Sequence, residues 1–337
     1  MDICDFLKKK YFYLKNKKYY KIYDCFLFFN ENDLLEIRLN ELSKVVDYFV
    51  VVESQHTFTK KNKEFNFDIK RFEKFKDKII YIQNKDFLKS PNPWDTEKQQ
   101  RNKLIEGLNL PYFPINACDN DLIILSDLDE IPKASKIIEA FYLIYKNNQK
   151  YIKFNLKNYH YALNNELLEP NEWTGPICSK RKNINNMQDF RHIKEYIKID
   201  NAGWHYSFVN NIENIIAKMN AYSHQEYNKW PNNDSQFVKE RIKSGHSHLE
   251  HSENIFRKVK LNNKNCPKYV LKNKNKYGKL IFKHEESSIW RKIMSIYNNE
   301  ICKLQKYTLG IRNKSSEKIN KFRAKLWILV QNKKETS

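Results

Sequence analysis

The fold is decided by the stretch LIILSDLDE at residues 122–130. Its first four residues are apolar, which is typical of a short strand that is covered on both faces in a parallel sheet. Three acidic residues, Asp127, Asp129 and Glu130, follow where this strand would leave the core. Ligands of open α/β sheets bind beyond the carboxyl ends of the strands. The stretch therefore predicts a parallel sheet with an acidic ligand site at its edge.

Strands and helices alternate along the chain around this stretch. Apolar runs predict strands at 25–29, 48–52 and 78–82, and apolar residues at helical spacing predict helices at 34–45, 96–108 and 134–145. We expect Asp95 or Thr96 to cap the second of these helices. Alternation with short connections indicates an α/β fold whose sheet is mostly parallel and flanked by helices. Asn30, Glu53 and Asp127 would then share the carboxyl edge.

The positive charge of the chain is concentrated at its two ends. The net charge is +21, of which residues 1–22 carry +5 and residues 261–337 carry +14. The 238 residues between these ends therefore carry only +2. An enzyme that acts on nucleic acid would show a basic face within its core domain. The distribution argues against nucleic acid as the partner.

Several absences in the sequence narrow the class of protein. Only 6 glycines are present, and neither a GxGxxG nor a P-loop sequence occurs, so a bound nucleotide would need another device to hold its phosphates. The 6 cysteines include no CxxC pair, which favours free thiols in a reducing compartment. No secretory signal opens the chain, and no apolar run approaches the ~18–20 residues that span a bilayer. These features predict a cytoplasmic protein.

The acidic strand end is a candidate metal site. In an extended strand, residues i and i+2 share a face, so Asp127 and Asp129 would converge on one point. Two unpaired carboxylates repel each other there unless a cation bridges them. Oxygen ligands favour Mg²⁺ or Mn²⁺, which keeps positions open for the phosphates of a substrate. The alternative is that both aspartates only cap a helix that starts near Pro132.

Two classes of enzyme carry an Asp-x-Asp motif at the end of a strand. In haloacid-dehalogenase-like phosphohydrolases, a Thr or Val follows the second Asp by two residues and a GDxxxD motif comes later. This chain has Ile131 at that position and lacks the later motif. The other class is the nucleotide-sugar glycosyltransferases of the GT-A fold. A non-catalytic basic protein that binds membranes or nucleic acid is a third interpretation, which the two charged ends keep open.

Six stretches of the sequence favour the second class. They are YDCFLFFNENDLLEIRLNEL (23–42), VVDYFVVVESQHTFT (45–59), EKQQRNKL (97–104), DLIILSDLDEIP (121–132), NAGWHYSF (201–208) and AYSHQEYN (221–228). In this order they resemble glycosyltransferase family 17, the family that includes the β-1,4-mannosyl-glycoprotein β-1,4-N-acetylglucosaminyltransferases. The resemblance implies a Rossmann-like GT-A fold, a UDP-sugar donor with UDP-N-acetylglucosamine foremost, Mn²⁺ or Mg²⁺, and inversion at the anomeric carbon.

The resemblance also implies roles for the acidic strand end. Asp127 and Asp129 would bind the metal and the ribose-phosphate part of the donor. His205 would be a third ligand, either of the metal or of the pyrophosphate. The alternative for His205 is a purely structural place in the core beside Trp204.

Three further residues would lie near the nucleotide, namely Asn30, Glu53 and Arg101. Arg101 has an alternative role as a structural ion-pair partner of Glu53 or Glu97. These residues, together with Asp127, form the predicted donor-binding set.

An inverting transfer needs a general base for the acceptor hydroxyl. We predict Glu226, in the sequence SHQE at 223–226, in this role, and Glu172 and Asp189 are the alternatives. The predicted function is thus transfer of a sugar, N-acetylglucosamine foremost, to a hydroxyl of a glycan acceptor.

The sequence departs from the family in two segments. Residues 57–63 read TFTKKNK, where the family often has a glycine in a TFxGKPK-like segment. Residues 245–251 read GHSHLEH in place of an acidic segment that ends in arginine. His246, His248 and His251 in that segment are a candidate metal site, and a solvated loop is the alternative.

The organisation predicted from these patterns has three parts. They are a basic aromatic segment at 1–22, a GT-A domain at 23–283 and a basic helical extension at 284–337. Ile319, Phe322, Leu326 and Leu329 recur at helical spacing among lysines and arginines, which is typical of helices that lie on anionic membranes. Both ends therefore predict peripheral membrane association, and packing on the domain or solvation is the alternative.

Overall fold

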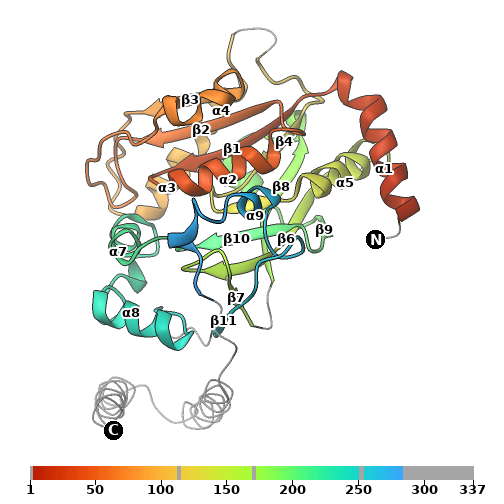
Figure 1. The fold of residues 1–337 in the computed structure, drawn as a ribbon. Helices are drawn as coiled ribbons and strands as arrows, with labels where there is room; N and C mark the ends of the chain where they lie inside the picture. The colour runs from red at the N-terminus through yellow and green to blue at the C-terminus, as the bar shows by residue number, and fades with distance from the viewer. Residues whose placement is uncertain (1–2, 112–114, 169–171, 250–253, 284–337) are drawn as a thin grey trace, which may run out of the picture. The chain divides into compact units, whose positions relative to one another are not determined.

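The predicted central strand lies in the middle of a large mixed sheet in the computed structural model of the chain, which describes residues 3–111, 115–168, 172–249 and 254–283. The strands follow the order β11-β7-β6-β8-β4-β1-β2-β3, with β10, β5 and β9 attached at β6 and its neighbours. Figure 1 shows helices on both sides of this sheet. The predicted extension at 284–337 lies outside the described residues.

The first half of the sheet is parallel, as the sequence predicts. Its strands are β1 (Ile22–Phe28), β2 (Tyr48–Ser54), β3 (Ile79–Asn84) and β4 (Leu122–Leu125). In its register Cys25 lies opposite Leu125, and Phe28 lies opposite Glu53. The segments that follow β1, β2 and β4 therefore leave the sheet at the same carboxyl edge.

Helices cover this half on two faces because its apolar residues alternate. Phe26 and Ile124 belong to a core cluster with residues of α2 (Asn32–Leu42) and α5 (Ala134–Tyr145). Cys25 and Leu125, their chain neighbours, belong to a second cluster with α4 (Leu104–Leu108). A strand that is buried on both faces reads as a continuous apolar run, which is why the sequence revealed these strands.

The predicted helix at 96–108 is two helices. The first, α3 (Pro93–Asn102), begins after Asn92, whose side chain accepts a hydrogen bond from the backbone N–H of Trp94. The expected caps Asp95 and Thr96 therefore lie inside the first turn. Pro93 at the first position explains the earlier start, because its fixed φ suits that position. The second helix, α4, follows at Leu104.

The second half of the sheet is largely antiparallel and was not predicted in detail. Its strands are β5 (Glu130–Pro132), β6 (Ile152–His160), β7 (Asn165–Leu167), β8 (Trp173–Lys180), β9 (Ile197–Ile199), β10 (Gly203–Ser207) and β11 (Phe256–Lys258). The shorter helices are α6 (Met187–Arg191), α7 (Ile212–Ala221), α8 (Ser235–Ser244) and α9 (Lys268–Lys272). Turns of 3₁₀ helix lie at Lys17–Tyr19, Ile69–Lys78, Arg181–Asn183, Gln225–Tyr227 and Gly278–Leu280.

Strand β10 brings a distant part of the chain to the acidic stretch. It pairs antiparallel with β5, and His205 lies opposite Glu130 in that register. Gly203 permits the approach, because a Cβ atom there would overlap the carbonyl oxygen of Ile131 and lie 2.8 Å from Cα of Pro132. Close contact of two backbones is a common reason for a glycine within a strand.

The N-terminal helix α1 (Ile3–Asn16) packs on α5, beside which it runs in Figure 1. Tyr13 is buried, and its ring meets Phe141 edge-on at a centroid distance of 5.2 Å. Tyr20, just beyond the helix, stacks on Tyr145 at 4.2 Å. One face of the predicted basic segment 1–22 is therefore part of the packed domain. No helix in the described part of the chain is long and apolar enough to cross a membrane.

Arg38 and Asp24 form an ion pair at the centre of the domain. Both side chains are fully buried, and the guanidinium makes two hydrogen bonds of 2.7 and 2.6 Å with the carboxylate. Its remaining N–H groups donate to Ser126 Oγ at 2.5 Å and to the backbone carbonyl oxygens of residues 127, 128 and 130 at 2.9 to 3.2 Å. The buried side chain of Arg38 thus supplies hydrogen-bond donors to the backbone carbonyl groups of the turn that follows β4.

Replacement of Arg38 with Met leaves the carboxylate of Asp24 buried without its charge partner. We expect this variant to lose about 3–5 kcal/mol of unfolding free energy, measured by urea denaturation at pH 7. Arg71→Met is the matched control, because Arg71 pairs with Asp33 and Glu36 while 34% of its side chain is exposed. We expect the control to lose less than about 1 kcal/mol. Equal losses in the two variants would contradict the role given to Arg38.

Candidate active site

The candidate site is built on the turn that follows β4. The backbone N–H of Glu130 donates to the carbonyl oxygen of Asp127, so residues 127–130 form a turn instead of extended chain. The expectation that Asp127 and Asp129 share a face as strand residues is therefore wrong. The alternative that they cap the next helix is also wrong, since α5 begins at Ala134 with Lys133 as its N-cap.

Asp127 lies between two arginines. Arg101 approaches its carboxylate to 3.3 Å and Arg191 approaches it to 3.2 Å. Burial acts to raise the pKa of Asp127, but the two guanidinium groups outweigh it and hold the pKa well below its usual range. The side chain is still 44% exposed, so this carboxylate is ionised and open to a ligand.

Glu130 is the buried acid of the turn. Arg191 makes a bidentate pair with its carboxylate, with N–O distances of 2.8 and 2.6 Å. The indole N–H of Trp173 donates to it at 2.5 Å, and the backbone N–H of Asp127 donates to it at 2.9 Å. Glu130 therefore positions Arg191 and Trp173 and has no exposed surface for a ligand.

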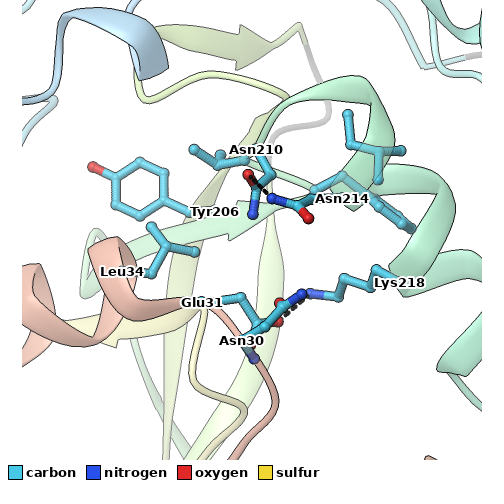
Figure 2. A pocket seen from close by; sticks show the side chains of 10 residues that line it. Asn30, Glu31, Leu34, Tyr206, Asn210, Asn214 and Lys218 are labelled. Atoms are coloured by element: carbon cyan, nitrogen blue, oxygen red, sulfur yellow. Dashed lines mark hydrogen bonds and ion pairs between the residues drawn. The ribbon is translucent and has the colours of Figure 1, made fainter. Parts of the chain in front are cut away.

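Asp129 faces a lysine from α7. Nζ of Lys218 lies 2.9 Å from Asp129 Oδ2 and 3.3 Å from Glu31 Oε1. Burial opposes the charge on the lysine, but the two carboxylates outweigh it and raise the pKa of Lys218 above its usual range. Figure 2 shows Lys218 reaching from its helix across a small pocket to Glu31 and Asn30. The lysine is thus a fixed positive charge beside the acidic turn.

His205 lies against the same turn on β10. Its Nδ1 is 2.6 Å from the side-chain oxygen of Asn158, whose amide nitrogen donates to the carbonyl of Glu172. Nδ1 is therefore the protonated nitrogen, and Nε2 faces Asp129 Oδ1 at 3.9 Å. Burial lowers the pKa of His205, so the imidazole is neutral at pH 7 and Nε2 carries a lone pair. The ring of Trp173 stacks on it at 4.5 Å.

Arg101 has the structural role considered for it, as the ion-pair partner of Glu97, and its place near a nucleotide stays a prediction. Besides Asp127, it pairs with Glu97 one helical turn earlier, at 2.5 Å, and donates to the side chain of Gln188 at 2.6 Å. The hydroxyl of Ser223 donates to the other oxygen of Glu97. The loop that begins at Ser223 is thereby linked through α3 to the acidic turn.

The two other predicted nucleotide contacts differ in what surrounds them. Asn30 is half-buried and lines the pocket of Figure 2 beside Glu31 and Lys218. Glu53 is fully buried and accepts hydrogen bonds from Lys63, Tyr81 and the backbone of residues 66 and 67. Its carboxylate holds the loop after β2, and its place beside a nucleotide stays a prediction.

The segment at 57–63 forms a turn in which a residue other than glycine has a left-handed backbone conformation. Lys60, at the position where the family often has Gly, has a φ of 65°, in the left-handed region. This conformation costs a non-glycine residue roughly 1–2 kcal/mol. Backbone hydrogen bonds from Thr57 to Lys61 and from Phe58 to Ala221 fix the segment against α7. Residues 57–63 thus form a turn with Lys60 in the left-handed region.

The three candidate general bases all lie on the surface. Glu226 is 54% exposed and pairs with Nδ1 of His224 at 2.6 Å. Burial acts to raise the pKa of Glu226, but the hydrogen bond from His224 outweighs it and lowers the pKa. Glu172 lies 3.2 Å from Lys198, and Asp189 is exposed in the first turn of α6, held by Asn186. Each is accessible to a ligand.

The histidines at 245–251 do not form a metal site within the described residues. His248 is buried, with Nδ1 2.8 Å from the hydroxyl of Tyr161 and Nε2 3.2 Å from the sulfur of Met219. His246 lies 3.1 Å from Ser244 Oγ, and His251 falls outside the described residues. No group of three His, Cys, Asp or Glu residues in the described ranges is arranged to hold a metal by itself. The described part of this segment is structural.

Three residues of the site escaped the sequence analysis. Arg191 comes from a helix of five residues, Lys218 from the helix after β10, and Arg38 from α2. The sequence could have indicated the role of Arg38, because an arginine on the apolar face of a helix needs a buried acid as its partner. Arg191 and Lys218 are ordinary basic residues by sequence, and only tertiary packing brings them to the turn.

The family model of glycosyltransferase family 17 matches residues 4–282 of the chain. The chain therefore belongs to glycosyltransferase family 17, and it is a glycosyltransferase with the predicted GT-A class of α/β fold. This confirms the resemblance drawn from the six stretches. The match favours the glycosyltransferase interpretation over a phosphohydrolase.

Several solved glycosyltransferase structures show distant similarity to the chain. Staphylococcus aureus TarS in complex with UDP-GlcNAc is 15% identical over 41% of this chain and 35% of its own, with a TM-score of 0.27. A second structure of S. aureus TarS is 12% identical over 69% of this chain and 44% of its own, with a TM-score of 0.34.

Glucosyl-3-phosphoglycerate synthase from Mycobacterium tuberculosis, in complex with Mn²⁺, UDP-glucose and phosphoglyceric acid, is 13% identical over 43% of this chain and 46% of its own, with a TM-score of 0.24. The chain thus spans less than half the length of each of these three structures. At such scores they locate no residue of the site. A comparison with curated proteins gave no match.

The structural role of His248 predicts a pH dependence of stability. Burial lowers its pKa to about 4, against about 6.5 in an unfolded chain. Between these values the unfolded state binds a proton that the folded state excludes, so the free energy of unfolding falls as the pH falls. The loss from this residue is about 3 kcal/mol between pH 7 and 4.

His248→Asn removes the titration while it retains a group that can bond Tyr161. We expect urea denaturation of this variant to show a shallower loss of stability between pH 7 and 4 than the wild type does. Parallel pH profiles for the two proteins would contradict the low pKa of His248.

Proposed function

We propose that the chain is an inverting, divalent-cation-dependent N-acetylglucosaminyltransferase that uses UDP-GlcNAc and transfers the sugar to a glycan hydroxyl. The observation that carries this proposal is the alternation of acids and fixed cations at the carboxyl edge of the sheet. Asp127 and Asp129 lie there beside Arg101, Arg191 and Lys218. A diphosphate and a divalent cation are the ligand pair that such a mixed site would take.

The cationic side chains suit the diphosphate of the donor. Arg101 and Arg191 are nine-tenths or more buried, and their own acids hold them in place. Positive charges that need no rearrangement stabilise a leaving group better than mobile ones. Together with Lys218 they supply what a glycine-rich loop supplies in other nucleotide sites.

The residues present fit a divalent cation. Asp129 Oδ1 and His205 Nε2 face each other at 3.9 Å, and both are acceptors without a hydrogen between them. Asn158 fixes the tautomer of His205, as the outer-shell partner of a metal-bound histidine does. Mg²⁺ and Mn²⁺ take one or two protein ligands and complete their shell with phosphate oxygens and water. Asp129 and His205 would hold the cation, Asp127 is the third candidate ligand, and the cation would supply Lewis-acid stabilisation of the diphosphate.

The acceptor side of the proposal is the surface around Trp94 and His224. The two rings meet edge-on at 4.5 Å, and Trp94 is 41% exposed. Trp94 and Arg101 lie on one face of α3, about 10 Å apart along its axis. That separation is on the order of two sugar rings. An exposed aromatic ring with a carboxylate beside it, here Glu226, suits the apolar face and hydroxyls of a sugar.

The reaction is then a single displacement. Glu226 accepts the proton of the acceptor hydroxyl while the hydroxyl oxygen forms a bond to the anomeric carbon of the donor sugar. The bond from that carbon to the UDP oxygen breaks, and its electron pair goes to the diphosphate. Arg101, Arg191 and Lys218 stabilise the negative charge that develops there.

A cytoplasmic site of action belongs to the same proposal. The described cysteines, Cys4, Cys25, Cys118, Cys178 and Cys266, form no disulfides with one another. Disulfides are rare in a reducing compartment.

Donor hydrolysis tests the donor half of this proposal. We expect the protein to release UDP from UDP-GlcNAc faster than from UDP-glucose or UDP-galactose, to stop in EDTA and to recover with Mn²⁺. Asn158→Ala should raise the Mn²⁺ concentration for half-maximal activity by roughly 10–100-fold, since it loosens a ligand without removing it.

His246→Gln is the matched control for that variant, because His246 stands outside the candidate site, and it should leave the Mn²⁺ requirement unchanged. Absence of turnover for every UDP-sugar, with no effect of Asp129→Ala on UDP binding, would refute the donor site.

Transfer to a glycan that a glycan-array screen identifies tests the acceptor half. Glu226→Gln should lower kcat by about 10²–10⁴ with little change in KM for UDP-GlcNAc. Trp94→Ala should raise KM for the acceptor and leave KM for the donor unchanged. Tyr19→Ala is the control for loss of an exposed aromatic ring. A larger loss of kcat in Glu172→Gln or Asp189→Asn than in Glu226→Gln would reassign the base.

A further inference from the structure

The outward face of α1 carries an apolar stripe without a partner in the described part of the chain. Ile3, Leu7, Tyr11 and Leu14 are 75%, 56%, 69% and 65% exposed. Their spacing of four, four and three residues places them in one row along the helix. The opposite face packs on α5 through Tyr13 and through Lys9, which pairs with Glu139 at 2.9 Å. The helix is thus apolar on two faces, and the domain uses only one of them.

Lysines border this row on both sides. At 100° per residue, Lys8 and Lys15 follow the row on one side and Lys10 lies on the other, and all three are exposed. The one acid of the helix, Asp5, pairs with Lys9 at 2.8 Å on the packed side. The outward face therefore combines apolar side chains with uncompensated positive charge.

These observations select one kind of partner. Two copies of the stripe face to face would bring their lysines together, and like charges at a contact are unfavourable. An anionic lipid surface takes the apolar row among its acyl chains and the lysines among its phosphates. Long lysine side chains beside an apolar row can reach the headgroups while the row is immersed.

We propose that α1 is a membrane-docking helix, which attaches the catalytic domain to an anionic bilayer through Ile3, Leu7, Tyr11, Leu14 and the lysines beside them. The docking depends on both components. The binding free energy from apolar contact of four side chains alone is small. The electrostatic attraction alone is screened by salt over about 10 Å at 0.1 M ionic strength. Binding should accordingly require anionic lipid and weaken as the salt concentration rises. This attachment is independent of the donor and acceptor roles proposed above.

Vesicle flotation of the full chain tests the proposal. The wild type should float with vesicles of phosphatidylcholine and phosphatidylglycerol at a 7:3 ratio and should not float with vesicles of phosphatidylcholine alone. The comparison separates the contribution of lipid charge from that of apolar contact. Leu7→Glu/Leu14→Glu should lower the bound fraction at least tenfold. Ile69→Glu/Ile197→Glu is the matched control, because these residues lie outside α1 and are 40% and 44% exposed, and it should bind as the wild type does.

The stripe variant must also be shown to fold, since loss of binding by an unfolded protein would mean nothing. Its urea denaturation and its donor hydrolysis in solution should match those of the wild type, because the substituted side chains face outward. Lys8→Glu/Lys15→Glu should lose binding to the anionic vesicles as well. Retention of binding by the stripe variant would overturn the proposal. So would a wild-type dimer that the stripe variant dissociates while neither protein binds vesicles, which would identify a second copy as the partner.

Discussion

The site depends on a single buried ion pair between Arg38 and Asp24. Asp24 lies in the central parallel strand β1 and Arg38 in the helix that follows it, and neither side chain is exposed. A buried arginine must use its N–H groups, and those that Asp24 leaves free donate to Ser126 and to the carbonyl oxygens of the turn. Because the backbone of the turn is fixed inward in this way, the carboxylates of Asp127 and Asp129 are directed to the edge of the sheet. The ion pair thereby couples the core of the fold to the geometry of the proposed donor site.

Around that turn, acids and bases are arranged in an order of increasing exposure. Glu130 is buried and forms an ion pair with Arg191. Asp129 is largely buried and lies beside Lys218 and His205. The side chain of Asp127 is exposed to solvent. This order keeps the arginines rigid and leaves the outermost acid accessible. In the proposed donor site, fixed side-chain cations would take the place of the backbone N–H groups of a glycine-rich loop around the phosphates, which suits a chain with only 6 glycines. Helix α1, at the N-terminal basic end, plays no part in this arrangement, and its exposed lysines Lys8, Lys10 and Lys15 lie away from the face that packs on α5.

The sequence was most informative where the chain is buried on both sides. The strands at 22–28, 48–54 and 122–125 each contain a run of consecutive apolar residues, and the acidic turn follows one of them directly, so the parallel half of the sheet and the position of the candidate site could be predicted. The antiparallel half could not, because buried polar residues such as Asn155 and Asn158 interrupt its apolar pattern. Arg191 and Lys218 lie 64 and 89 residues beyond the acids they meet, and nothing local distinguishes them from surface cations. The local geometry of 127–130 was also missed, since the turn is imposed by Arg38 from another element.

The most direct test of the account is a crystal structure of the protein with UDP-GlcNAc and Mn²⁺, with data collected to locate manganese by its anomalous scattering. The account predicts an anomalous peak bound by Asp129 and His205, with the diphosphate of the nucleotide between that peak and the side chains of Arg101 and Arg191. A nucleotide bound away from the turn after β4, or a diphosphate neutralised by the three cations with no manganese at Asp129 and His205, would contradict it.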